Sequence, residues 1–125
     1  MSEPPIPGGS KLVSLDEAVA GVADGSTVMI GGWGDCGTPH RLVAALVDSG
    51  ASDLVVVITG SAPADPLFES DRVARLVTSF GSYPGAAATG RAFERRVAAG
   101  MEVELCSQGV LAERIRAGGA GRGNR

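Results

Sequence analysis

The chain has 125 residues, a length typical of one domain, with 44% hydrophobic and 20% charged residues, a balance typical of globular proteins. Its formal net charge of −3 argues against nucleic acid as a partner, and no apolar run approaches the ~18 residues that a membrane span needs. The two cysteines follow no metal-binding spacing, and no signal peptide is recognisable, so we predict free thiols in a cytoplasmic protein without a metal site.

The N-terminal part predicts a leader followed by a helix. Residues 1–13 are rich in proline and glycine near their start and are expected to form a mobile leader. Ser14 and Glu17 have the spacing of a capping box, in which each side chain bonds the backbone of the other residue. Apolar residues with helical spacing follow, so we predict a helix that ends near Asp24 and packs on a sheet.

The next segment predicts a strand–helix–strand unit. Residues 27–30 and 54–58 are continuous apolar runs, as expected for strands covered on both faces. Between them, Thr38 is a candidate cap and Pro39 a candidate first residue for a helix over 40–47. A βαβ unit of this length is expected to have a right-handed crossover.

The rest of the sequence has a weaker apolar pattern, but it also predicts strands and helices in alternation. It predicts loops over residues 59–67 and 80–90, strands over 76–79 and 101–105, and helices over 91–99 and 110–117. Residues 118–125 lack apolar periodicity and are predicted to be a disordered tail, which leaves a domain over 14–117. The predicted fold class is α/β, with a mainly parallel sheet and helices on both faces.

The most informative segment is the glycine-rich turn between the first strand and its helix. Gly31, Gly32, Gly34 and Gly37 lie there, and residues 32–37 match G-x-G-x-x-G, the dinucleotide-binding fingerprint. That fingerprint also requires an acid at the end of the next strand, but the nearest acid, Asp53, precedes the strand. A nucleotide-binding domain therefore remains an alternative: the sequence has the glycine motif but lacks the acid after the next strand.

A wider pattern carries a resemblance to a known family. Residues 24–39 (DGSTVMIGGWGDCGTP) and 102–119 (EVELCSQGVLAERIRAGG) are similar to two blocks of the alpha (A) subunit of family I coenzyme A transferases, which include the 3-oxoacid CoA-transferases. The segments SLDEAVAGVADG and LVAALVDSGASDL resemble the same subunit, and the likeness covers most of residues 14–121. Because the family sequences continue well beyond the second block, the resemblance implies about half of an alpha subunit.

The resemblance implies a chemistry in which this chain is not the nucleophile. Such enzymes move CoA between an acyl-CoA and a small carboxylic or 3-oxo acid, with CoA as a substrate and the catalytic glutamate on a beta subunit. The chain is then inactive alone, contributes no catalytic residue, and lines the substrate site. The residues expected to line that site are Gly31, Gly32, Trp33, Gly34, Gly37 and Gln108.

Each of these residues also has a purely structural explanation. The glycines can serve only a tight turn, Trp33 can be a core or partner-facing aromatic, and Gln108 can be a capping amide. Asp35 lies where the family has an apolar residue, and its charge would repel an anionic substrate. An inactive pseudo-subunit that only binds its partner is therefore a third hypothesis.

Three further groups are assigned structural roles from the sequence. His40 is expected to be a solvated imidazole at a helix end, and Cys36 a buried, inert thiol. The arginines at 91, 95 and 96 are expected on an exposed helix face, although they could meet CoA phosphates.

Overall fold

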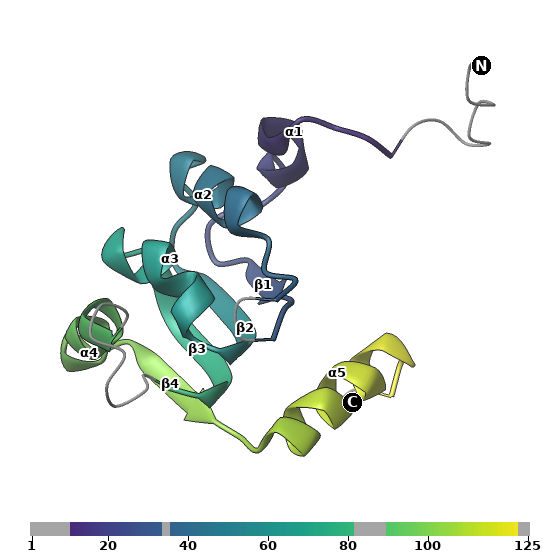
Figure 1. Ribbon diagram of the computed structural model, residues 1–125, viewed down its shortest axis with the longest axis vertical. Coiled ribbons are helices and arrows are strands. Elements are labelled where there is room, and N and C mark those ends of the chain that lie inside the picture. The colour runs from purple at the N-terminus through teal and green to yellow at the C-terminus, as the bar shows by residue number, and fades with distance from the viewer. Residues whose placement is uncertain (1–10, 34–35, 82–89, 123–125) are drawn as a thin grey trace.

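The computed structural model describes residues 11–33, 36–81 and 90–122. They form a four-stranded, fully parallel sheet in the order β1-β2-β3-β4 (Figure 1). The strands are β1 (Thr27–Ile30), β2 (Leu54–Gly60), β3 (Val73–Phe80) and β4 (Glu102–Leu105). The helices are α1 (Leu15–Val19), α2 (His40–Asp48), α3 (Asp65–Glu69), α4 (Gly90–Ala98) and α5 (Gln108–Gly119), with a 3-10 turn, η1 (Ala62–Ala64). The predicted α/β class with a parallel sheet is confirmed.

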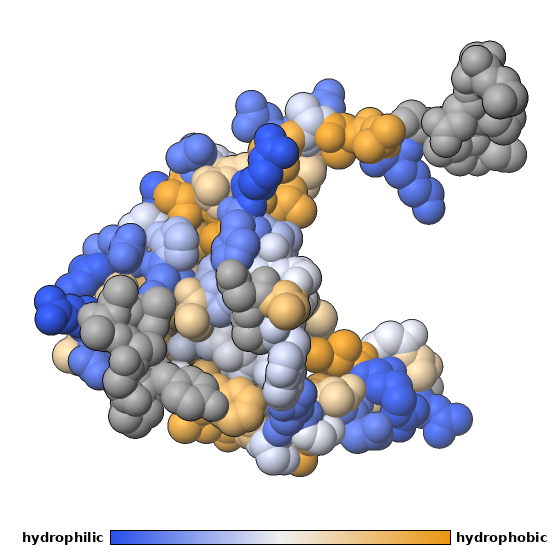
Figure 2. All heavy atoms as spheres, in the orientation of Figure 1, coloured by the Kyte–Doolittle hydropathy of each residue, from blue (hydrophilic) through white to orange (hydrophobic). Residues whose placement is uncertain are grey.

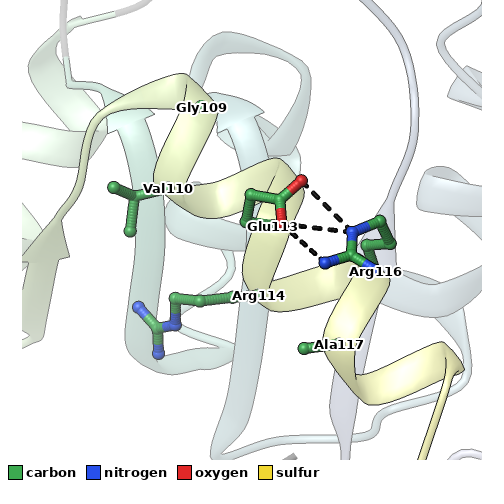
Figure 3. Close-up of a pocket in the computed structure, with 6 residues that line it drawn as sticks. All are labelled: Gly109, Val110, Glu113, Arg114, Arg116 and Ala117. Carbon is green, nitrogen blue, oxygen red and sulfur yellow. Dashed lines mark hydrogen bonds and ion pairs between the residues drawn. The ribbon is translucent and has the colours of Figure 1, made fainter. Parts of the chain in front are cut away.

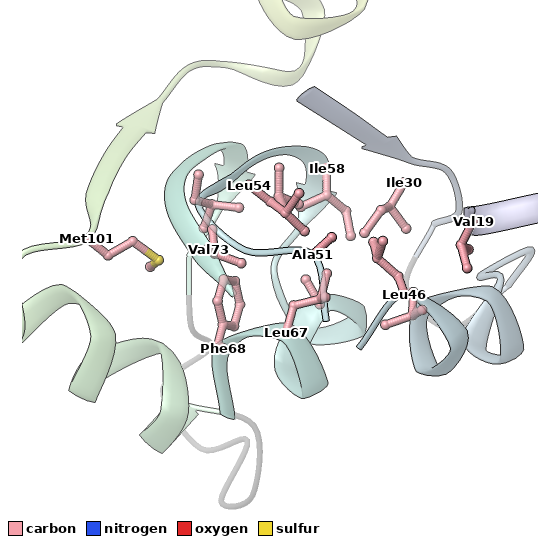
Figure 4. Close-up of a cluster of buried hydrophobic side chains, with 14 of the residues drawn as sticks. Val19, Ile30, Leu46, Ala51, Leu54, Ile58, Leu67, Phe68, Val73 and Met101 are labelled. Atoms are coloured by element: carbon pink, nitrogen blue, oxygen red, sulfur yellow. The ribbon is translucent and has the colours of Figure 1, made fainter. Parts of the chain in front are cut away.

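One face of the sheet carries the hydrophobic core. Leu54, Val56 and Ile58 alternate along β2 and are buried, because α2 and α3 pack against this face. Phe68 of α3 is fully buried and meets Phe93 of α4 edge to face, with ring centroids 5.9 Å apart. Figure 4 shows the side chains of the helices pointing toward those of the strands across this core. The core therefore lies between this face and α2, α3 and α4, and Val19 of α1 also belongs to it.

The opposite face is covered by α5 alone among the described elements. Glu104 of β4 lies on this face and pairs with Arg114 of α5. Leu111, one turn before Ile115 in α5, is buried, and α5 contacts β3. Helices on both faces, as predicted, are thus confirmed, although the second face has only one.

The loop predicted over residues 59–67 is wrong. β2 continues to Gly60, and η1 and α3 follow almost directly. The prediction failed because Pro63 and Pro66 were interpreted as loop signals, whereas both lie in the first turn of a helix. Proline is tolerated there because its missing N–H would have no intrahelical partner. Most of the other predicted loop, over 80–90, lies outside the described residues.

The strand predicted over residues 76–79 is too short, because β3 begins at Val73. The pairing register shifts beside Ala74, so that Val73 and Leu76 both face the core although they are three residues apart. Such a bulge breaks the alternation by which strands are recognised. Arg75, which interrupts the apolar run, lies on the opposite face and pairs with Glu102 and Glu104.

Helix boundaries differ from the predictions in both directions. The capping box of Ser14 and Glu17 is present, but α1 ends at Val19, and the chain turns before Val22 packs on the core. α5 is longer than predicted at both ends, so that Gly118 and Gly119, which were assigned to the disordered tail, are its last residues. The remaining bounds of the domain and its leader stay predictions.

The arginines of α4 do not form a simple exposed face. Arg95 pairs with Asp71 and donates to the carbonyls of Phe68 and Glu69. Arg96 donates to the carbonyl of Val73 at 2.9 Å and is only 20% exposed. Both side chains thus tie α4 to the end of α3 and the start of β3. These contacts explain the positions of Arg95 and Arg96 without CoA phosphates. Arg91 and Arg95 are exposed, and only Arg96 is partly buried.

Candidate functional site

The predicted site residues lie at one edge of the sheet. In a parallel sheet the carboxyl ends of all strands meet at the same edge, which is where α/β proteins bind ligands. The glycine-rich segment follows β1 at this edge, and Gln108 follows β4. Because β1 and β4 are the two outer strands, about 14 Å separates the two segments at about 4.8 Å per strand. The structure places them at a common edge without bringing them into contact.

Only some of the glycines are required by the backbone. Gly32 has φ +120°, and a Cβ there would lie 2.7 Å from Thr38 Oγ1 and 3.2 Å from the Cys36 carbonyl oxygen. Gly37 has φ +73°, a left-handed conformation that side chains disfavour. A Cβ on Gly31 would meet nothing within 4 Å, so its place in the motif has no steric reason. Gly34 lies outside the described residues, as does Asp35.

Hydrogen bonds close the glycine-rich segment on itself. Trp33 N donates to the Cys36 carbonyl at 2.9 Å, and Cys36 N donates to the Trp33 carbonyl at 3.0 Å. The amides of Trp33 and Cys36 are therefore both occupied within the segment. Cys36 is exposed, so the prediction of a buried thiol is wrong.

The entry to α2 also differs from the prediction. Pro39 occupies the N-cap position, without a side-chain capping bond, and the helix begins at His40. Thr38, the predicted cap, lies instead against Gly32. The glycine-rich segment and the residue before Pro39 thus pack on each other, and the helix starts three residues after Gly37. His40 is exposed at the first position of α2, as predicted.

An aromatic pair spans the end of β2. The rings of Trp33 and Phe80 meet edge to face, with centroids 6.4 Å apart and an interplanar angle of 84°. Phe80 ends β3 and pairs in register with Gly60, so the two rings join the ends of β1 and β3 across a residue without a side chain. Trp33 is 58% exposed and Phe80 41% exposed. Together they form an apolar wall that faces solvent, which argues against a core role for Trp33.

Gln108 is the exposed first residue of α5. Ser107 holds the N-cap position of α5, and its side chain makes no capping bond. The first N–H groups of a helix have no intrahelical partner and favour negative charge nearby. Gln108 therefore adds an amide side chain to the start of the longest described helix.

Charged residues of β3, β4 and α5 form a network of ion pairs. Glu104 accepts from Arg75 at 2.6 Å through one carboxylate oxygen and from Arg114 through the other. The hydrogen bond from Arg114 is the main reason that the pKa of Glu104 lies below its usual value, with the charge of Arg75 adding to it. Glu104 stays ionised and paired, so it is held as a structural carboxylate.

A shallow groove of about 430 Å³ lies along α5, away from the predicted site residues (Figure 3). Its lining residues are Gly109, Val110, Glu113, Arg114, Arg116 and Ala117. All belong to one helix, on the side turned away from Leu111. Figure 3 shows Glu113 and Arg116 bonded to each other beside it, with a shortest distance of 2.8 Å. The groove contains none of the residues that the motifs indicate.

Sequence reasoning missed Asp65, at the start of α3. Its Oδ1 is buried and has no hydrogen-bond partner among the described residues. Burial, together with the charge of Glu69, raises its pKa from 3.8 to about 6. The folded chain therefore holds this proton more tightly than the unfolded chain, so that stability is highest below pH 4 and falls as the pH rises to about 6.

Asp65→Asn should remove this pH dependence. A shift of this size corresponds to at most roughly 3 kcal/mol, and partial exposure lowers our expectation to about 1 kcal/mol. We expect the free energy of unfolding of the variant, relative to the wild type, to rise by that amount between pH 3.5 and pH 7.5 in urea titrations. Glu69→Gln, at an exposed position, is the control and should show a smaller rise. If the difference in free energy of unfolding between Asp65→Asn and the wild type stayed constant across this pH range, the raised pKa of Asp65 would be contradicted.

Comparison with known proteins identifies the family. A model of the coenzyme A transferase family matches residues 12–125. This chain belongs to the coenzyme A transferase family. It is 42% identical over 118 residues to the alpha subunit of a probable coenzyme A transferase of Bacillus subtilis, covering 90% of this chain and 49% of the relative. It is 41% identical over 119 residues to the alpha subunit of the acetate CoA-transferase of Escherichia coli, covering 91% of this chain and 51% of the relative.

Solved structures agree on the fold of this CoA transferase chain. A variant of the decarboxylase AibA/AibB matches with a TM-score of 0.76 and 27% identity over 87% of this chain and 43% of that one. An acyl-CoA transferase, YdiF from Escherichia coli O157:H7, matches with a TM-score of 0.74 at 19% identity, over 98% of this chain and 25% of that one. The chain spans about half the length of the curated relatives described above.

The described residues contain neither a membrane-spanning helix nor a metal site beside these features. In residues 11–33, 36–81 and 90–122, no helix is long and apolar enough to cross a membrane. The same residues contain no group of three or more His, Cys, Asp or Glu side chains placed to hold a metal ion.

Proposed function

We propose that this chain is an alpha-subunit-like part of a CoA transferase that moves CoA between an acyl-CoA and a small carboxylic or 3-oxo acid. The observation that carries the proposal is the family match over residues 12–125. A relative at 44% identity is named as part of a probable succinyl-CoA:3-ketoacid coenzyme A transferase, and one at 41% as part of an acetate CoA-transferase. The partner is a beta subunit, and the two free cysteines suit a reducing cytoplasm.

In this proposal the nucleophile comes from the partner. A glutamate carboxylate on the beta subunit carries out the attack on the acyl-CoA thioester, giving an acyl-glutamyl anhydride and the CoA thiolate. The thiolate then attacks the anhydride at the glutamyl carbonyl, releasing the carboxylic acid and leaving a glutamyl-CoA thioester. An acceptor acid collects CoA by the reverse steps. Covalent catalysis of this kind divides one difficult transfer into easier ones.

The contribution of this chain is one wall of an elongated site. The exposed wall of Trp33 and Phe80 suits the apolar part of an acyl-CoA. Gln108, three strands away at the start of α5, suits a polar part of the same long substrate or a developing oxyanion. Gly32 and Gly37 keep the segment that carries Trp33 in its closed conformation.

The nucleotide-binding alternative has little support in this geometry. The fingerprint requires the glycine turn to open directly into a helix, whereas here the turn closes between Trp33 and Cys36 and α2 begins at His40. β2 ends in Gly60, without the acid that would bind a ribose. The strand order β1-β2-β3-β4 also has no reversal, the usual place for a dinucleotide.

Co-expression with a candidate beta subunit that has an intact glutamate motif tests the proposal. Size-exclusion chromatography should show a stable heteromeric complex, which neither protein forms alone. The isolated chain should bind no NAD in calorimetry at millimolar concentration. Saturable NAD binding without a complex would favour the nucleotide-binding alternative, and a complex without CoA transfer would favour the pseudo-subunit.

Trp33→Ala should weaken substrate binding in that complex. Loss of an exposed indole contact worth about 1.4 kcal/mol corresponds to a roughly tenfold rise in KM for the acyl-CoA, with kcat within about twofold. Steady-state kinetics of the complex would measure this, with Val97→Ala as the control because Val97 is exposed on α4, away from the site. Equal KM values for the two variants would exclude Trp33 from the site.

A further inference from the structure

Thr78 of β3 is a fully buried polar residue in an otherwise apolar row of the sheet. Register aligns it with Ile30, Ile58 and Leu105. Its relative exposure is 0%, and the buried Ile58 beside it shows that an aliphatic side chain suits this layer. Burying a hydroxyl costs free energy unless the group is hydrogen-bonded, and valine has the same shape without that cost. The Thr78 hydroxyl therefore has a role other than filling the core.

The hydroxyl lies between two backbone carbonyls at the carboxyl edge of the sheet. Thr78 Oγ1 is 3.0 Å from the carbonyl oxygen of Thr59 in β2 and 3.0 Å from that of Phe80 in β3. A hydroxyl has one proton to donate, so the two carbonyls share it. The backbone carbonyl of Thr78 in turn accepts a hydrogen bond from Cys106 N, just after β4, at 3.1 Å. Thr78 thus joins the ends of three strands.

These bonds lie where the sheet narrows from four strands to two. β1 and β4 both end in the row of Thr78, whereas Gly60 of β2 and Phe80 of β3 pair two residues farther along. The Phe80 carbonyl also accepts a hydrogen bond from Ser61 N at 3.2 Å. Phe80 is therefore at the tip of a two-stranded projection, and Thr78 and Ser61 both hold its backbone.

The Phe80 ring is one half of the apolar wall, and it meets Trp33 edge to face with 6.4 Å between the ring centroids. Figure 2 shows hydrophobic side chains on the surface at this edge of the sheet, near the point where β4 leads into α5. We propose that the Thr78 hydroxyl positions this wall: it fixes the backbone of Phe80, and the Phe80 ring fixes the orientation of Trp33. The effect on substrate rests on the proposed function, whereas the placement of the rings does not.

The fluorescence of Trp33 tests this placement, because Trp33 is the only tryptophan of the chain. Thr78→Val keeps the shape of the side chain and removes the hydroxyl. In the whole isolated chain we expect the emission maximum of Thr78→Val to move to longer wavelength and acrylamide quenching to increase, because the indole loses contact with Phe80. Thr78→Ser retains the hydroxyl and should restore the wild-type spectrum.

Ser79→Ala is the matched control. Ser79 is the next residue of β3, and its Oγ is also buried, but it has no hydrogen-bond partner among the described residues. Its removal should leave the Trp33 emission unchanged. In a Phe80→Leu background, Thr78→Val should have no further effect on the spectrum, because the ring that transmits the change is absent.

In the complex with a beta subunit, Thr78→Val should raise the KM for the acyl-CoA about three- to fivefold with kcat within about twofold, the factor expected for one neutral hydrogen bond. Thr78→Ser and Ser79→Ala should keep the wild-type KM. A shifted Trp33 spectrum with an unchanged KM would exclude Thr78 from positioning the substrate site.

Four results would overturn the placement itself. Two are an unchanged Trp33 spectrum in Thr78→Val and an equal shift in Ser79→Ala. A third is a Thr78→Ser spectrum like that of Thr78→Val, since the methyl group and not the hydroxyl would then matter. The fourth is a Thr78→Val chain that is unfolded in water, because the hydroxyl would then support the whole sheet. Absence of CoA transfer by the wild-type complex would count against the proposed function and leave the predicted spectra unchanged.

Discussion

Gly32→Ala should lower the free energy of unfolding by about 2–3 kcal/mol, because alanine would be held in a backbone region where such residues cost roughly 1–3 kcal/mol and would also clash. The clash is specific: the new Cβ would lie 2.7 Å from Thr38 Oγ1 and 3.1 Å from the Thr38 backbone nitrogen. Urea titration of the isolated chain would measure the change.

Gly31→Ala is the matched control for this experiment. The two glycines are adjacent, but a Cβ on Gly31 meets nothing within 4 Å, and Gly31 does not have a left-handed φ. We expect its free energy of unfolding to stay within about 0.5 kcal/mol of the wild type. Equal effects of the two substitutions would show that Gly32 does not hold the conformation of the described residues 31–33 and 36–38.

Phe68→Ala should have the largest effect on stability, a loss of about 3–5 kcal/mol. The ring is fully buried between α3 and the sheet and meets Phe93 edge to face, so its removal leaves a cavity and breaks the contact between α3 and α4. Domains of this size have only about 5–15 kcal/mol of stability in total. The variant should therefore unfold at much lower urea concentration.

Phe80→Ala serves as the control, because it removes the same ring from a position that is 41% exposed. We expect a loss of about 1 kcal/mol or less for this surface ring. If the two variants unfolded at the same urea concentration, the buried position of Phe68 in the core would be contradicted.

The βαβ unit could be predicted from sequence because its signals are local. The apolar runs of β1 and β2 are continuous, and Gly50 ends the helix between them with a positive φ of 81°. Prediction from local sequence failed at β3, where contacts with other strands override the usual alternation of apolar and polar residues. The bulge at Ala74 hides the alternation of β3, and Arg75 finds its partners on β4, a strand 27 residues later in the chain.

The candidate site could be predicted only as a set of residues. Motif spacing indicates Gly32 and Gly31 equally, and only the backbone conformation separates the glycine that is required from the one that is not. The pairing of Trp33 with Phe80 depends on strand order, which no local pattern encodes. The distance between Trp33 and Gln108 has the same origin, because the two residues follow the outer strands of one sheet.

The central claim is that this chain works as part of a CoA transferase, and its most direct test is the transfer of CoA from succinyl-CoA to acetoacetate by the purified complex with a beta subunit. We predict transfer by the complex and none by either protein alone, with the roughly tenfold rise in KM in the Trp33→Ala complex. A stable complex with an intact partner glutamate that transfers no CoA to acetoacetate or acetate would contradict the claim.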